Sequence, residues 1–106
     1  MTKEILKQEM DKNTLTLTII GDIDHHSAKA LRETIDASLF YHRPKLLRLV
    51  LSEVSFMDSS GLGLILGRYT RMNELGGKMV LVSPTRQIEK ILTLAAIHKT
   101  IPTERK

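Results

Sequence analysis

Residues 46–63 read LLRLVLSEVSFMDSSGLG, and in this stretch a strand pattern runs directly into a helix pattern. Residues 46–51 are almost continuously apolar, which is typical of a strand covered on both faces and therefore central in its sheet. Apolar side chains then recur at helical spacing, at Leu62, Ile65, Leu66, Tyr69 and Met72. We predict a helix over about 60–75, which Gly76-Gly77 ends.

The chain before this stretch predicts a hairpin. Residues 14–20, TLTLTII, place Leu15, Leu17 and Ile19 on one face and threonines on the other, the pattern of a half-buried strand. An earlier strand is predicted over 4–10, with residues 11–13 as the turn. The two strands therefore pair.

A first helix is predicted between the hairpin and the central strand. Apolar side chains recur at helical spacing, at Ala28, Leu31, Ile35 and Leu39. Either Asp24 or Ser27 can cap the start of this helix, and we expect it to end near Tyr41-His42, before Pro44.

The chain after residue 77 completes an α/β pattern. Residues 78–82, KMVLV, predict a strand, residues 88–95 mark a third helix, and residues 98–102 suggest a short edge strand. The predicted order is β-β-α-β-α-β-α with a further short strand. It implies one mixed, largely parallel sheet with helices packed on it and right-handed crossovers.

The composition narrows the classes of function. A chain of 106 residues predicts one domain over 1–106. Because there is no cysteine and none of the four histidines forms a His-x-x-x-His pair, we expect no metal site. The net charge is +4, but its cations are scattered among twelve acids and the chain has only four aromatic residues, so we expect no direct binding of nucleic acid. No apolar run reaches the roughly 18 residues of a membrane span, which predicts a cytoplasmic protein without a membrane partner.

Residues 57–63, MDSSGLG, follow the end of the predicted central strand, where α/β proteins place their sites. The dinucleotide fingerprint fails because Leu66 stands where its third glycine belongs, and a P-loop fails because no lysine lies between residues 45 and 78. Met57 stands where a hydrolase nucleophile elbow needs its first glycine. We therefore assign no catalytic residue and no cofactor.

Two interpretations of the motif remain open from the residues alone. In the structural one, Asp58 or Ser59 caps a helix, and the glycines let that helix approach the sheet. In the functional one, a serine is phosphorylated by another enzyme, because the free N–H groups and positive dipole end of a helix tolerate a phosphoryl group there. Asp58 then repels the added charge.

The residues FMDSSGLGLILGRY at 56–69, together with GDIDHHSA at 21–28, resemble the STAS-domain anti-sigma factor antagonists of bacteria, and most of all their sporulation branch. The similarity thins after Pro84, where residues 94–97 stand in place of a glycine-containing turn and the last helix of the family is not apparent. The resemblance implies a STAS fold and a partner-switching cycle. An anti-sigma factor that is also a serine kinase phosphorylates the first serine after the aspartate, here Ser59, and a serine phosphatase reverses the modification. The unmodified form binds the kinase and releases its sigma factor.

The resemblance also implies a partner-binding surface around Ser59. It comprises Asp24, His25, Asp58, Ser59, Ser60, Leu62, Gly63 and Arg68. Asp24 and His25 are expected at the same sheet edge as Ser59, Ser60 in the cap or first turn, Leu62 in the core, and Arg68 facing solvent towards an acidic partner residue. The two glycines are expected to keep the helix start slim.

Two alternative functions remain open. A general-stress or stressosome-type antagonist would use the same serine with another kinase. A small serine-dependent or nucleotide-binding enzyme, using Ser59 with His25, would show turnover without any partner protein.

Overall fold

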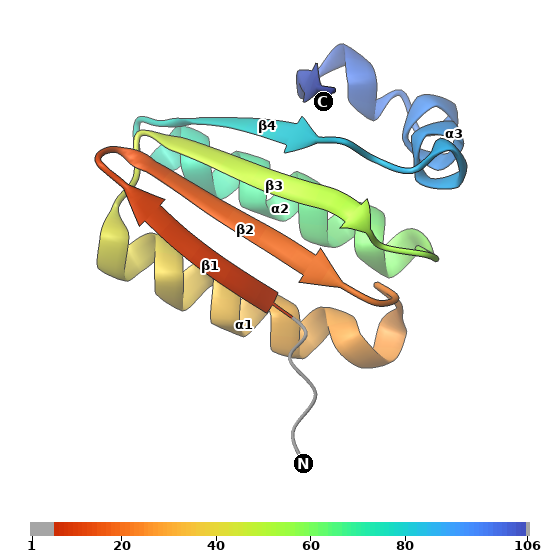
Figure 1. The fold of residues 1–106 in the computed structure, drawn as a ribbon, viewed down its shortest axis with the longest axis horizontal. Helices are drawn as coiled ribbons and strands as arrows, with labels where there is room; N and C mark the ends of the chain where they lie inside the picture. The colour runs from red at the N-terminus through yellow and green to blue at the C-terminus, as the bar shows by residue number, and fades with distance from the viewer. Residues whose placement is uncertain (1–5, 106) are drawn as a thin grey trace.

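The fold is built around a five-stranded mixed sheet (Figure 1). The computed structural model describes residues 6–105. Each strand lies beside its neighbour in sequence, in the order β1-β2-β3-β4-β5, with only β1 and β2 antiparallel. The strands are β1 (Leu6–Asp11), β2 (Thr14–Ile20), β3 (Leu46–Glu53), β4 (Lys78–Val82) and β5 (Thr103–Glu104). The predicted α/β class is confirmed.

The hairpin of β1 and β2 forms as predicted. Leu15, Leu17 and Ile19 of β2 are fully buried, while its threonines are only half-buried. Two residues, Lys12 and Asn13, connect the paired ends Asp11 and Thr14. The predicted first strand began at residue 4, and its first two positions lie outside the described residues.

Helices α1 (His25–His42) and α2 (Ser59–Glu74) lie together on one face of the sheet, and α3 (Arg86–Leu94) follows β4 near the edge (Figure 1). Asp24, not Ser27, is the N-cap of α1. A core of leucine, isoleucine, valine and methionine fills the space between the sheet and the helices. Between residues 6 and 105, no helix combines the length and apolar character that crossing a membrane requires.

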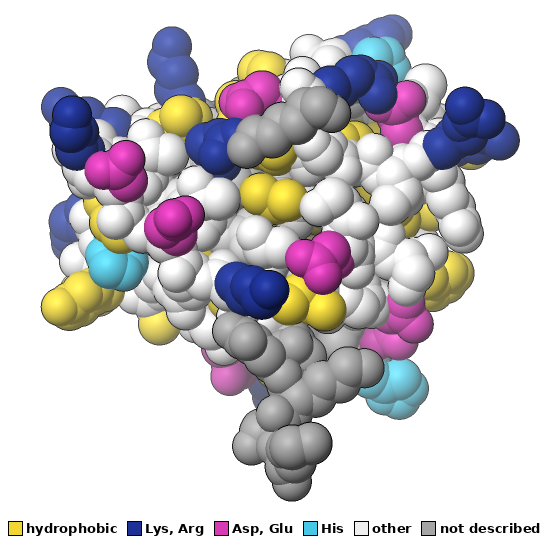
Figure 2. Space-filling view, viewed as in Figure 1, with side chains coloured by type: hydrophobic (Ala, Val, Ile, Leu, Met, Phe, Trp, Pro, Cys, Tyr) yellow, Lys and Arg dark blue, Asp and Glu magenta, His cyan; other side chains and the backbone are white. Residues whose placement is uncertain are grey.

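The burial of β3 differs from the prediction. The strand is central, but only Leu47, Leu49 and Leu51 are fully buried, whereas Leu46, Arg48 and Val50 on the other face are half-buried. Both α1 and α2 cover the same side of the sheet (Figure 1). Figure 2 shows the opposite side, where hydrophobic and charged side chains are interspersed. A continuous apolar run did not identify a strand covered on both faces.

The buried face of α2 is rotated from the predicted one. Leu64 is buried where the periodicity favoured Leu66, and Leu66 is 40% exposed. Ile65 and Met72 belong to the core, as predicted. The helix therefore turns Leu64 rather than Leu66 towards the core.

The edge strand is shorter and later than predicted. Residues 98–102 form part of a 3-10 helix, Ile97–Lys99, and a turn, while the strand is Thr103–Glu104, parallel to β4. Ala96, which precedes the 3-10 helix, has a φ of 59°, in the left-handed region. This is the turn for which the similarity to the antagonist family predicted a glycine.

Candidate functional site

The loops that follow β2 and β3 are joined at one edge of the sheet. Ile23 and Met57 form an isolated parallel bridge. The Ile23 N–H donates to the Phe56 carbonyl at 2.9 Å, and the Asp58 N–H donates to the Ile23 carbonyl at 3.2 Å. The beginnings of α1 and α2 are therefore held next to each other.

Asp58 connects the two helices through its carboxylate. One oxygen, Oδ1, accepts the backbone N–H of Ser60 at 2.8 Å and so caps α2. The other, Oδ2, accepts the backbone N–H of His25, the first residue of α1, at 3.2 Å. One side chain thus satisfies N–H groups at two helix N-termini that would otherwise lack partners. Asp24 and His25 share an edge with Ser59, as the sequence predicted.

Asp24 caps α1 with a reciprocal hydrogen-bond pair. Its carboxylate accepts the N–H groups of Ser27 at 3.0 Å and His26 at 2.9 Å, and the Asp24 N–H donates to the Ser27 hydroxyl at 3.0 Å. These bonds favour the ionised form, and the Ser27 N–H is the main cause that the pKa of Asp24 lies below its ordinary value. The Asp24 backbone conformation is fixed by this cap.

Ser59 is the first residue of α2 and its side chain is exposed. Within residues 6–105, no hydrogen bond occupies its hydroxyl. Ser60, in the first turn rather than at the cap, is half-buried, and its N–H is taken by Asp58. Ser59 is therefore the serine of the pair that is accessible to another enzyme.

The two glycines of the motif have different environments. A Cβ on Gly61 would lie 2.1 Å from Cγ of Met57 and 3.1 Å from the Ile23 carbonyl oxygen, so only glycine fits there without displacement. A Cβ on Gly63 would meet nothing within 4 Å. Gly61 lets α2 approach the joined loops. Gly63 adds no side chain to the outer surface of the helix start, as expected. Leu62 is half-buried and packs against the core.

Arg68 does not face solvent, and that prediction is wrong. It is 6% exposed, and its Nε lies 3.0 Å from Oδ1 of Asp36 on α1. Burial lowers the pKa of Arg68 from its ordinary value, an effect that Asp36 opposes. Because its charge is paired inside the molecule, Arg68 has no free charge to offer a partner.

A groove between α1 and α2 opens beside Ser59, and sequence reasoning missed it. Its volume is about 380 Å³. The residues that line it are His25, Ala28, Lys29, Arg32, Ser60, Gly63 and Leu64. The signal for the α1 side was the spacing of His25, Lys29 and Arg32, at i, i+4 and i+7 of one helix.

The described part of the chain contains no group of three or more His, Asp or Glu side chains placed to hold a metal ion. The site offers instead an exposed hydroxyl, two helix N-termini and a groove. Such an arrangement can accept a covalent modification and present a surface to another molecule.

The chain is similar to known proteins over most of its length. A family model described as STAS domain matches residues 6–106. The anti-sigma F factor antagonist of Paenibacillus polymyxa is 31% identical over 97 residues, which cover 92% of this chain and 83% of the relative. The anti-sigma-B factor antagonist of Bacillus subtilis (strain 168) is 28% identical over 93 residues, covering 88% and 84%.

A solved structure, the Bacillus cell fate determinant SpoIIAA in its phosphorylated form, has the same fold. It superimposes with a TM-score of 0.72 at 26% identity, covering 92% of this chain and 89% of that one. The fold, the matching family model and the relatives agree over nearly the whole chain. The chain therefore belongs to the STAS-domain family, and within that family to the anti-sigma factor antagonists.

Proposed function

We propose that Ser59 is a phosphorylation switch that controls binding of an anti-sigma factor with serine kinase activity. The unmodified chain binds this anti-sigma factor, which then releases its sigma factor. Phosphorylation of Ser59 by the same kinase ends the interaction, and a serine phosphatase restores it. The observation that carries the proposal is the exposed, unbonded Ser59 hydroxyl at the first position of α2.

The surroundings of Ser59 support a modification that leaves the fold intact. A phosphoryl group there lies at the positive end of the α2 dipole and outside the core. Asp58 is held beside it by the N–H groups of Ser60 and His25, so its carboxylate stays in place as a neighbouring negative charge. The modified and unmodified surfaces then differ mainly in charge.

The size of this charge change is sufficient for a switch. A phosphoserine carries nearly two negative charges at neutral pH. Like charges brought together in an interface cost several kcal/mol, and each 1.4 kcal/mol is a factor of about ten in affinity. We expect phosphorylation of Ser59 to weaken binding by at least about a hundredfold.

Under this proposal, the chain regulates sporulation rather than the general stress response. The anti-sigma F factor antagonist is 31% identical and the anti-sigma-B factor antagonist 28% identical, so the stress-type function is the second candidate. Binding to purified anti-sigma F and anti-sigma-B factors separates the two. Tighter binding to the anti-sigma-B factor would replace the sporulation assignment with the stress one.

A small enzyme using Ser59 with His25 is not supported. Anti-sigma factor antagonists are regulators, and the chain is therefore not an enzyme. In the described residues, the His25 backbone N–H donates to Asp58, but no hydrogen bond joins the His25 ring to Ser59. A nucleophile needs such contact with its base.

The test is intact mass and peptide mapping after incubation with ATP and the cognate anti-sigma kinase. Wild type should gain one phosphate that maps to Ser59. Ser59→Ala should gain none, and Ser60→Ala, the matched control at the neighbouring serine, should still be modified. A phosphate that maps elsewhere, or none on wild type, would refute the proposal.

A further inference from the structure

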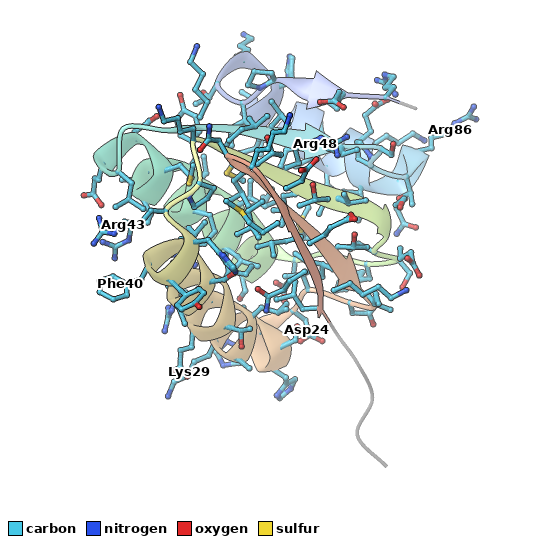
Figure 3. The ribbon with its side chains drawn as sticks, turned by 60° about the vertical axis from the view of Figure 1, so that its left-hand side comes forward. Asp24, Lys29, Phe40, Arg43, Arg48 and Arg86 are labelled. Carbon is cyan, nitrogen blue, oxygen red and sulfur yellow. The ribbon has the colours of Figure 1, made fainter. Side chains whose placement is uncertain are left out.

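The groove between α1 and α2 has one sign of charge. Lys29 and Arg32 of α1 are exposed at its wall, with His25 at its mouth, and none of the acidic residues between positions 6 and 105 lines it. Lys29 extends from α1 away from the sheet (Figure 3). The α2 wall is formed by the uncharged residues Ser60, Gly63 and Leu64.

The cations of this groove lack internal partners. In the described part of the chain, neither Lys29 nor Arg32 forms a salt bridge. Four other arginines do, and these are Arg48, Arg68, Arg71 and Arg105. Two unpaired cations in one concave surface attract a negatively charged group.

We propose that this groove binds an acidic segment of the anti-sigma factor, whose carboxylates pair with Lys29 and Arg32. This inference rests on the proposed function, since it takes the anti-sigma factor as the partner. Charge complementarity specifies the occupant: a segment carrying Asp or Glu side chains.

The place of the groove also explains how one modification controls docking. Ser60 and Gly63 line the groove, and Ser59 precedes them in the same helical turn. A carboxylate entering the groove therefore approaches the dianion of phosphorylated Ser59. Attraction by the groove is replaced by repulsion at its mouth, without movement of either helix.

The experiment compares three forms of the full chain: wild type, Lys29→Ala/Arg32→Ala, and Lys45→Ala/Lys78→Ala. The control pair removes the same charge from exposed positions at the opposite end of β3 and β4. Affinity for the purified anti-sigma kinase is measured at low and high ionic strength, and circular dichroism verifies that each variant is folded. Phosphorylation of Ser59 is followed in parallel.

The groove variant should bind about tenfold more weakly at low ionic strength, with a smaller salt dependence, while the control pair binds like wild type. An affinity of the groove variant within about twofold of wild type would overturn the inference, as would equal losses of affinity in the groove variant and the control pair. Those results leave the switch intact as long as wild type binds and is phosphorylated on Ser59. A wild type that does neither refutes the proposed function itself.

Discussion

The glycines of α2 allow a prediction in which one substitution has opposite effects at two positions of one helix. A Cβ at position 61 would lie 2.1 Å from Cγ and 2.7 Å from Sδ of Met57, and 3.1 Å from the Ile23 carbonyl oxygen. A Cβ at position 67 would meet no heavy atom within 4 Å. Alanine at position 61 would therefore clash with Met57, whereas alanine at position 67 would only increase the helix propensity.

The magnitudes follow from these environments. Gly67→Ala should raise the free energy of unfolding by about 1 kcal/mol, or the Tm by about 4 °C, because glycine is a poor residue in a helix interior. Gly61→Ala forces Met57, which is 2% exposed, out of its position. Overpacking of this kind costs about 1–3 kcal/mol, and a smaller propensity gain in the first turn leaves a net loss of about 1–2 kcal/mol.

Urea denaturation followed by circular dichroism measures both variants against wild type. Met57→Ala serves as the second arm, because it removes the side chain that the new Cβ would strike. The loss caused by Gly61→Ala should shrink by at least about 1 kcal/mol in the Met57→Ala background. If Gly61→Ala stabilises the chain as Gly67→Ala does, the close approach of α2 to the joined loops is refuted.

Three further outcomes are expected from the same denaturation assay. Asp36→Ala should cost about 2 kcal/mol because it leaves Arg68 buried without its partner, and Asp36→Ala/Arg68→Met should recover most of that loss; equal losses in both would contradict the ion pair. Ala96→Gly should stabilise the chain by about 0.5–1 kcal/mol, since its φ of 59° strains alanine, and a destabilised variant would contradict that backbone conformation. The lowered pKa of Asp24 stabilises the fold above its ordinary value of 3.8, and this contribution is lost as the pH falls through the lowered pKa; Asp24→Asn should therefore lose less stability than wild type on acidification, and an unchanged pH profile would count against the cap.

The sequence pattern predicted an element correctly where its apolar and polar side chains fall on two different faces. The alternation in TLTLTII gave β2 with its observed bounds, because threonine and leucine fall on opposite faces of a strand. The apolar run LLRLVL predicted β3 correctly, but it also predicted that both faces of the strand are buried, and one face is only half-buried. Whether a helix covers that face depends on where α1 and α2 pack, which the strand itself does not encode.

Arg68 shows a second limit of sequence patterns. Its charge predicted exposure, although position 68 lies three residues after Ile65 and four before Met72, both buried, so the helical spacing alone favours the core face. Its partner Asp36 comes from α1, 32 positions earlier, and becomes a neighbour only when the two helices pack side by side. Contacts between helices of this kind are invisible in the spacing of either helix.

The candidate site was predictable only where its features depend on a single element or on the strand order. The position of Ser59 at a helix start, and of Asp24 and His25 at the same sheet edge, follows from strand order and cap chemistry. The bridge from Asp58 to His25 and the groove with Lys29 and Arg32 require the relative position of two helices. These features came only from the structure.

The strand order has a consequence for synthesis of the chain on the ribosome. Every described strand after β1 pairs with the strand that precedes it in sequence, so its partner has already emerged when it is made. After β1, no described strand has to wait for a later segment to find its first partner. Because exposed strand edges favour aggregation, this order allows the sheet to grow from the hairpin outward as translation proceeds.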